Sequence, residues 1–159
     1  MDYEQLKLNN QLCFPLYAAS RLITRAYQPQ LDKLGITYPQ YLVLMVLWET
    51  DGITVNEIAQ KLILNTNTLT PLLKRMETQG IVRRQRSGQD ERKVLISLSE
   101  QGRDMRVQAA AVPLELIKEL EHSPLSLAEL IDMKDKLHRL IDFMNGASSS
   151  DPGRACLTD

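Results

Sequence analysis

The sequence has few of the residues that form covalent cross-links and metal sites. Its two cysteines, Cys13 and Cys156, lie near opposite ends of the chain, and its two histidines, His122 and His138, lie far from both. No Cys-x-x-Cys pair occurs. The sequence therefore predicts neither a structural disulfide nor a metal site, and it indicates no cofactor.

Long apolar runs and aromatic residues are also scarce. Aromatics make up 5% of the chain, and no apolar run approaches the roughly 18 residues that cross a membrane. No basic segment followed by an apolar run opens the chain, so we expect a soluble, cytoplasmic protein with no membrane association. With 43% hydrophobic residues among 159, the chain is long enough for one mainly aliphatic core.

Apolar residues recur at helical spacing over residues 8–26, which predicts a first helix. Proline is tolerated in a first helical turn, so Pro15 places the start of the ordered helix near Leu12, after a looser arm. We expect Pro29 to end this helix, with a short helical turn before Gly35.

A second helix has a clear start signal. Thr37, Pro39 and Gln40 combine a capping residue, an early proline and a glutamine three positions after the threonine. Residues 41–48 are apolar nearly all round the helix. We therefore expect this helix to be the buried hub of the domain.

Residues 54–98 predict the two helices and hairpin of a winged helix-turn-helix. Residues 54–62 and 65–79 carry helical patterns, and residues 81–86 and 92–98 carry strand patterns around a polar loop. In this fold the second helix enters the DNA major groove, and the hairpin reaches a neighbouring groove or the backbone.

The same segment concentrates positive charge. Residues 65–93 hold seven Lys and Arg against three Asp and Glu, a net charge of +4, whereas the whole chain carries −1. Such a basic face fits the phosphates of double-stranded DNA. The alternative is a hairpin whose charges are only solvated.

We expect the DNA-contacting side chains on the second helix and the hairpin. Asn65 is placed to cap the helix, and Pro71 implies either a later start near Thr68 or a kink. Asp90 and Arg92 would share a strand face, so Asp90 would orient Arg92 for a minor groove; the alternative is a surface ion pair. The candidate DNA-binding residues are Thr66, Asn67, Thr68, Thr70, Pro71, Lys74, Arg75, Arg86, Asp90 and Arg92.

Two more helical segments follow the hairpin. One begins at Ser99 and should kink at Pro113, and a capping box at residues 126–129 opens the last helix. The apolar stripes of the first and last helices exceed what one core needs, so we expect a homodimer interface; the alternative is intramolecular packing. The predicted organisation is an N-terminal arm and dimerisation helix (1–36), the DNA-binding domain (37–98), C-terminal dimerisation helices (99–145) and a disordered tail (146–159).

Cys13 is open to two interpretations. A lone cysteine between apolar neighbours is commonly an inert buried residue. A helix N-terminus, in contrast, favours the thiolate that reacts with oxidants. Tyr17, Tyr27 and Tyr38 are available as phenol donors, although their spacing does not establish that they are near Cys13.

Four segments resemble the MarR family of winged-helix repressors, and within it the organic hydroperoxide resistance regulators: residues 10–21, 34–42, 69–77 and 90–92. The resemblance implies a homodimer that binds inverted-repeat operator DNA and is released when an organic hydroperoxide oxidises Cys13. It also implies that Cys13 is hydrogen-bonded by two tyrosines of the partner subunit, which match Tyr27 and Tyr38.

One departure from the family concerns the second thiol. Members that form an intersubunit disulfide carry the resolving cysteine on the long helix after the hairpin, where this chain has none. We therefore expect a small-molecule thiol to form a mixed disulfide with oxidised Cys13, with Cys156 as the alternative resolving thiol.

Two other functions remain open at this stage. One is a MarR-type repressor relieved by a small aromatic or phenolic ligand, with Cys13 as a bystander. The other is a thiol peroxidase that uses Cys13, although the chain has no Thr-x-x-Cys peroxidase site. We expect a regulator and not an enzyme.

Overall fold

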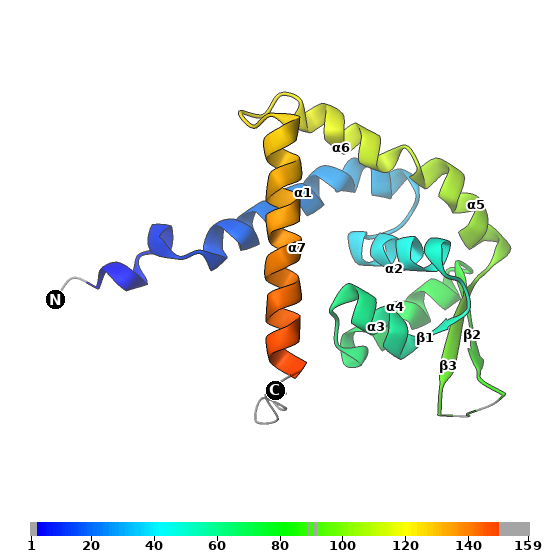
Figure 1. Ribbon diagram of the computed structural model, residues 1–159. Helices are drawn as coiled ribbons and strands as arrows, with labels where there is room; N and C mark the ends of the chain where they lie inside the picture. The colour runs from blue at the N-terminus through cyan, green and yellow to red at the C-terminus, as the bar shows by residue number, and fades with distance from the viewer. Residues whose placement is uncertain (1–2, 89, 91, 150–159) are drawn as a thin grey trace. The chain divides into compact units, whose positions relative to one another are not determined.

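The computed structural model describes residues 3–88, 90 and 92–149 (Figure 1). The chain divides into two compact units, with the boundary between Leu116 and Ile117. The mainly α architecture with a small hairpin is confirmed. The elements are η1 (Glu4–Leu6), η2 (Leu8–Asn10), α1 (Cys13–Lys33), α2 (Tyr38–Glu49), β1 (Ile53–Thr54), α3 (Val55–Leu62), α4 (Thr66–Thr78), β2 (Val82–Arg86), β3 (Val94–Leu98), α5 (Glu100–Ala109), α6 (Val112–Leu120) and α7 (Leu127–Ser149).

The hub of the first unit is α2, as its nearly continuous apolar sequence predicts. It contacts α1, α3, α4 and α5, and Val43, Leu44 and Leu47 on it are fully buried. Each such side chain contributes about 1.5–3 kcal/mol on burial. The predicted start signal is also present, because Gln40 Oε1 accepts the backbone N–H of Thr37 at 2.8 Å.

Helix α1 begins at Cys13, close to its predicted start, but the prediction that Pro29 ends it is wrong. The helix continues through Pro29 to Lys33. Proline removes only the hydrogen bond to the carbonyl of Arg25, which is an exposed residue, whereas Leu31 in the same turn is 0% exposed in the core. Burial of Leu31 therefore holds the last turn in helical form.

The three strands form one antiparallel sheet in the order β1-β3-β2. Ile96 on the central strand is paired with Ile53 on one side and Arg84 on the other. The sequence predicted the hairpin β2–β3 but not β1, because a strand of two residues shows no alternation. Figure 1 shows this sheet beside α3 and α4.

Side-chain contacts from the end of α2 attach the hairpin and α5 to the hub. Asp51 Oδ1 accepts the backbone N–H of Leu98 at 2.7 Å, and Trp48 Nε1 donates to the Gly102 carbonyl at 2.9 Å. A Cβ at position 102 would lie 2.2 Å from the Ile81 carbonyl oxygen. Only glycine allows α5 to approach Ile81, the residue before β2, so closely.

The segment after the hairpin forms two helices instead of one kinked helix. α5 ends at Ala109, and α6 begins at Val112. Pro113 then lies in the first turn of α6, where its missing N–H removes no helical hydrogen bond.

The predicted capping box of α7 is present, since the backbone N–H of Ser126 donates to Glu129 Oε2 at 2.8 Å. The helix continues over residues 146–149, for which the sequence predicted disorder. The rest of the predicted tail, including Cys156, lies outside the described residues. None of the described helices is long and apolar enough to cross a membrane.

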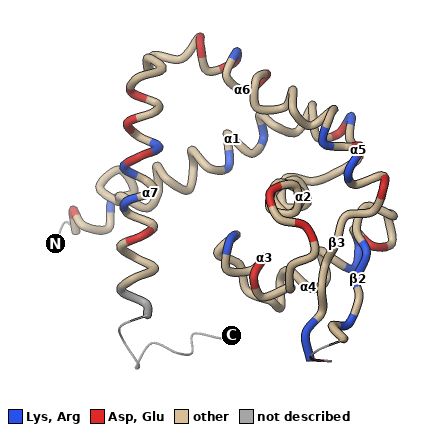
Figure 2. Tube along the Cα trace, turned by 45° about the vertical axis from the view of Figure 1, so that its right-hand side comes forward, with Lys and Arg blue, Asp and Glu red and all other residues tan. Residues whose placement is uncertain are grey.

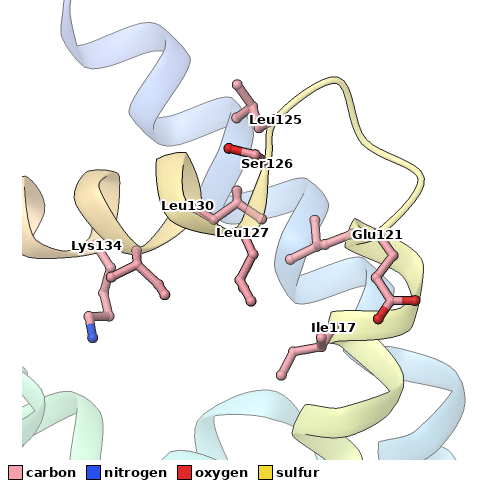
Figure 3. A pocket seen from close by; sticks show the side chains of 9 residues that line it. Ile117, Glu121, Leu125, Ser126, Leu127, Leu130 and Lys134 are labelled. Carbon is pink, nitrogen blue, oxygen red and sulfur yellow. The ribbon is translucent and has the colours of Figure 1, made fainter.

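The end of α6, the start of α7 and the connection between them line an open pocket of about 330 Å³. Figure 3 shows Ile117 on α6 and Leu127 and Leu130 on α7 around this space, with Glu121 and Lys134 at its edge. Its lining is mainly aliphatic and belongs wholly to the second unit.

Candidate functional site

Helix α4 has a buried apolar face and an exposed polar face. Its core side chains are Leu69, Leu72, Leu73 and Met76. Of the candidate DNA-binding residues on α4, two are half-buried (Thr66 and Thr70) and five are exposed (Asn67, Thr68, Pro71, Lys74 and Arg75). The polar side chains are therefore available for a ligand, while the apolar ones fix the helix to the hub.

The start of α4 differs in part from the sequence prediction. Asn65 occupies the N-cap position, but its side chain makes no capping hydrogen bond. The helix starts at Thr66 and runs through Pro71, which excludes the later start near Thr68. Thr70 Oγ1 donates to the Thr66 carbonyl at 2.7 Å, so only its acceptor capacity remains for an external partner.

At the tip of the hairpin, Asp90 orders Arg92. Asp90 Oδ1 accepts the backbone N–H of Arg92 at 3.1 Å and its Nε–H at 3.2 Å. The contact arises in the turn, because β3 begins only at Val94; the prediction that the two residues share a strand face is wrong. The Arg92 side chain is 92% exposed, so it extends into solvent while Asp90 orients it.

Lys and Arg residues gather along β2 and, on the other side of the hairpin, at residues 92–93 just before β3 (Figure 2). Arg83 and Arg86 are exposed on β2. Arg84 instead turns toward α4, with its Nη1 3.4 Å from Glu77 Oε2. The hairpin thus presents an exposed basic surface, with one of its cations directed inward.

A polar cleft of about 480 Å³ separates α3 and the start of α4 from the hairpin. Its lining includes Asn56, Gln60, Thr70, Arg84 and Lys93. Arg84 Nε is buried and has no hydrogen-bond partner among the described residues. The sequence alone does not single out Arg84, Asn56 or Gln60 as site residues, because they come from separate elements and share no local motif.

Cys13 is the first residue of α1 and carries an exposed free thiol. Its neighbour Leu12 is 71% exposed, and Phe14 is also exposed. A single chain therefore does not bury Cys13, which argues against the interpretation as an inert core cysteine. The helix N-terminus favours negative charge at this position.

Tyr27 on α1 and Tyr38 on α2 pack against each other with ring centroids 5.2 Å apart. Tyr41 joins them, with its centroid 6.0 Å from that of Tyr27 and 6.4 Å from that of Tyr38. Burial raises the pKa of Tyr27 and of Tyr38, and for Tyr27 the neighbouring phenols add to this effect. Both phenols therefore remain protonated hydrogen-bond donors at neutral pH.

Within one chain, Cys13 is not brought together with Tyr27 and Tyr38. Cys13 and Tyr27 are fourteen positions apart on α1, about 21 Å at the helical rise of about 1.5 Å per residue. Tyr17, one turn from Cys13, is engaged elsewhere: its hydroxyl accepts Arg21 Nη1 at 3.3 Å, and the guanidinium lies 5.6 Å from its ring centroid.

Comparison with known proteins agrees with this geometry. Residues 25–107 match the family model of the transcriptional regulator SarA/Rot. The organic hydroperoxide resistance transcriptional regulator of Bacillus subtilis is 47% identical over 143 residues, which cover 90% of this chain and 95% of that protein.

Solved structures show the same similarity. Reduced AbfR bound to DNA has a TM-score of 0.73 and 39% identity over 92% of this chain and 99% of that chain; AbfR is a protein of Staphylococcus epidermidis. Its disulfide form has a TM-score of 0.57 and 40% identity, covering 87% of this chain and 95% of that chain. MarR of E. coli has a TM-score of 0.65 and 25% identity, covering 82% and 96%. This chain therefore belongs to the MarR family of winged-helix transcriptional regulators, in the branch of the organic hydroperoxide resistance regulators.

Proposed function

We propose that this protein is a redox-sensing transcriptional repressor, not an enzyme. It binds inverted-repeat operator DNA as a homodimer in the cytoplasm and is released when an organic hydroperoxide oxidises Cys13. The observation that carries the proposal is an exposed thiol at the first residue of α1, in a chain that also bears a polar α4 face and a basic hairpin.

The DNA-binding part of the proposal follows from the exposed surfaces of α4 and the hairpin. Asn67, Thr68 and Pro71 lie toward the start of α4, where short side chains can reach base edges in a major groove. Lys74 and Arg75 follow in the next turn and suit phosphates. Arg92, held by Asp90, extends from the hairpin and suits a minor groove.

A homodimer is supported by apolar side chains that a single chain leaves exposed. Surfaces of this kind generally mark interfaces. On α1 they are Phe14, Leu16, Leu22 and Ile23, on α6 Leu114 and Ile117, and on α7 Leu127, Ile131, Met133, Leu140, Ile141, Phe143 and Met144.

A second copy also supplies what Cys13 lacks in its own chain. Fourteen helical positions amount to about 40° less than four full turns, so Cys13 and Tyr27 lie on nearly the same face of α1. If the α1 helices of two chains cross in antiparallel orientation, Cys13 of one chain lies opposite Tyr27 of the partner subunit. Tyr38 packs against Tyr27 and would take part in the same site.

The reaction at this site is an oxidation of sulfur by the peroxide. The Cys13 thiolate attacks one oxygen of the O–O bond; an S–O bond forms, the O–O bond breaks, and the alkoxide takes up a proton and leaves as an alcohol. The proton on the transferred oxygen completes the sulfenic acid. Tyr27 and Tyr38, as protonated phenols, donate hydrogen bonds that favour the thiolate before attack.

The sulfenic acid then condenses with a thiol, forming a disulfide and releasing water. We propose a small-molecule thiol as that partner, because α5 and α6 hold no cysteine. Mass spectrometry after treatment with peroxide and a small thiol tests this step. A Cys13–Cys156 cross-link as the dominant product would instead identify Cys156 as the resolving thiol.

The main test uses an operator selected by the reduced protein from randomised inverted-repeat duplexes. We expect binding to weaken steeply between two salt concentrations, because several phosphates are neutralised. Cumene hydroperoxide should release the wild-type protein, while Cys13→Ser should bind the operator normally and stay bound. Release of Cys13→Ser at the wild-type oxidant concentration contradicts the proposed function.

A second candidate is a repressor relieved by a small aromatic or phenolic ligand. The observation in its favour is the polar cleft beside α4, where Arg84 Nε lacks a partner among the described residues. An acidic or phenolic oxygen would satisfy that donor. This function predicts that such a ligand releases Cys13→Ser and wild type equally, and that Arg84→Met abolishes the response.

A further inference from the structure

A buried glutamine connects the start of α2 to the end of α4. Gln40 is 4% exposed and is one of only two buried polar residues among the described part of the chain. Its Oε1 accepts the Thr37 backbone N–H at 2.8 Å and lies 3.2 Å from Thr37 Oγ1. Its Nε2 donates to Gln79 Oε1 at 2.7 Å.

The start of α2 and the end of α4, which the Gln40 side chain joins, have different roles in the proposed function. Thr37 and Gln40 flank Tyr38, which packs on Tyr27 in the proposed sensor site. Gln79 is the C-cap of α4, and its backbone N–H donates to the Arg75 carbonyl at 2.9 Å. The tie between Gln40 and Gln79 thus links the turn that carries Tyr38 to the last turn of the helix that faces DNA.

We propose that Gln40 and Gln79 are positioning residues that transmit displacement of the α2 N-terminus to α4. This inference rests on the proposed function, and it names the contact through which oxidation at Cys13 reaches the DNA-binding helix. Oxidation displaces Tyr38 and the capped first turn of α2, and the Gln40 amide carries that displacement to the α4 C-terminus.

The geometry and surroundings of the Gln40–Gln79 contact suit it to transmit a displacement from α2 to α4. Apolar packing also joins α2 to α4 through the core, but it has no preferred direction, whereas a hydrogen bond of 2.7 Å restricts both distance and angle. The tie also borders a cleft of about 390 Å³ that is lined by Thr37, Leu72, Arg75 and Thr78. Because Gln79 is exposed, water can replace its contact with Gln40 when the two ends separate.

The test compares operator dissociation constants of the reduced and fully oxidised protein by fluorescence anisotropy. Mass spectrometry confirms equal oxidation of Cys13 in every sample. Gln79→Ala removes the tie and leaves Gln40 free to cap α2. We expect its reduced form to bind within about twofold of wild type, and the ratio of oxidised to reduced dissociation constants to fall about three- to tenfold, the worth of one hydrogen bond.

Matched variants separate transmission from a merely structural role. Gln79→Glu keeps an acceptor for Gln40 Nε2 and should keep the wild-type ratio. Thr78→Ala removes an exposed hydroxyl whose one hydrogen bond among the described residues lies within α4, to the Lys74 carbonyl, and this variant should also keep the wild-type ratio. Gln40→Glu combined with Gln79→Glu keeps the cap but places two carboxylates together, and should lower the ratio as Gln79→Ala does.

The outcomes distinguish this inference from the proposed function. A wild-type ratio in Gln79→Ala, with wild type responding to oxidant and Cys13→Ser not responding, overturns the inference alone. An equal drop in Thr78→Ala overturns it as well, because that variant leaves the tie intact. If wild type itself shows no oxidant response, the proposed function fails, and the inference fails with it.

Discussion

Asp90 Oδ1 accepts two hydrogen bonds from Arg92, one from the backbone N–H at 3.1 Å and one from Nε–H at 3.2 Å. The Asp90 carboxylate therefore orients the Arg92 side chain through its Nε, while the rest of the guanidinium group lies in solvent. We predict that Arg92→Ala weakens operator binding about tenfold and lowers the salt dependence by about one released counterion. Titrations at several salt concentrations measure both effects.

Asp90→Ala serves as the matched variant for the hairpin. It leaves the Arg92 charge in place but removes its orientation, so affinity should fall less than in Arg92→Ala, with the salt dependence nearly unchanged. The unfolding free energy should stay within about 0.5 kcal/mol of wild type, because exposed ion pairs contribute little. Equal salt dependence in Arg92→Ala and wild type would show that Arg92 does not contact the DNA.

The proposed sensor site can be tested with mixed dimers in a Cys156→Ser background. One chain carries Cys13→Ser and the other Tyr27→Phe, and two affinity tags isolate the heterodimer. If the site is built across two chains, the one remaining Cys13 faces an intact Tyr27 of the partner subunit. It should react with cumene hydroperoxide at the wild-type rate per thiol.

The Tyr27→Phe homodimer is the comparison for the mixed dimers. Its thiols lack the phenol donor and should react about tenfold more slowly, as expected for loss of one hydrogen bond to a charged group. Stopped-flow measurement of peroxide consumption gives both rates. A slow heterodimer would place Cys13 and Tyr27 in a site within one chain, against the distance along α1.

The raised pKa values of Tyr27 and Tyr38 predict a loss of stability in alkali. Burial is the main cause for both, and the unfolded value is near 10.0. Between that value and the higher folded pKa, the folded state holds more protons, so the unfolding free energy falls as pH rises above 10.0. Urea unfolding from pH 8 to about 11 should show this fall. The fall should be smaller in the Tyr27→Phe, Tyr38→Phe double variant. If the unfolding free energy of both proteins falls equally with pH, the raised pKa values of Tyr27 and Tyr38 are not its cause.

Gly102 tests the attachment of the hairpin to α5. A Cβ there would lie 2.2 Å from the Ile81 carbonyl oxygen, a backbone atom that cannot move aside without displacing β2. We predict that Gly102→Ala lowers the unfolding free energy by about 1–3 kcal/mol. Gly88→Ala is the control, since among the described residues no atom beyond its chain neighbours lies within 4 Å of the added Cβ. Urea denaturation that found the two variants equally stable would contradict the close approach.

Features with a short-range cause could be predicted from the sequence. The capping pairs Thr37–Gln40 and Ser126–Glu129 mark helix starts because their contacts span three residues. The apolar character of residues 41–48 predicted a buried α2 for a similarly local reason. The polar face of α4 and the basic hairpin were equally accessible to sequence reasoning.

Tertiary packing decided what local preference did not. Pro29 is a local signal for a helix end, yet burial of Leu31 extends α1 past it. The strand β1, of two residues, exists only because β3 lies beside it.

The contacts on which the proposals depend lie further apart in the chain. Gln40 meets Gln79 across 39 positions, and Asp51 meets Leu98 across 47. No spacing rule predicts such pairs, because they depend on how separate elements pack. The sequence by itself determined which side chains are available for DNA and for the oxidant. Tertiary structure alone decided which of them touch, as in the packing of Tyr38 on α2 against Tyr27 on α1.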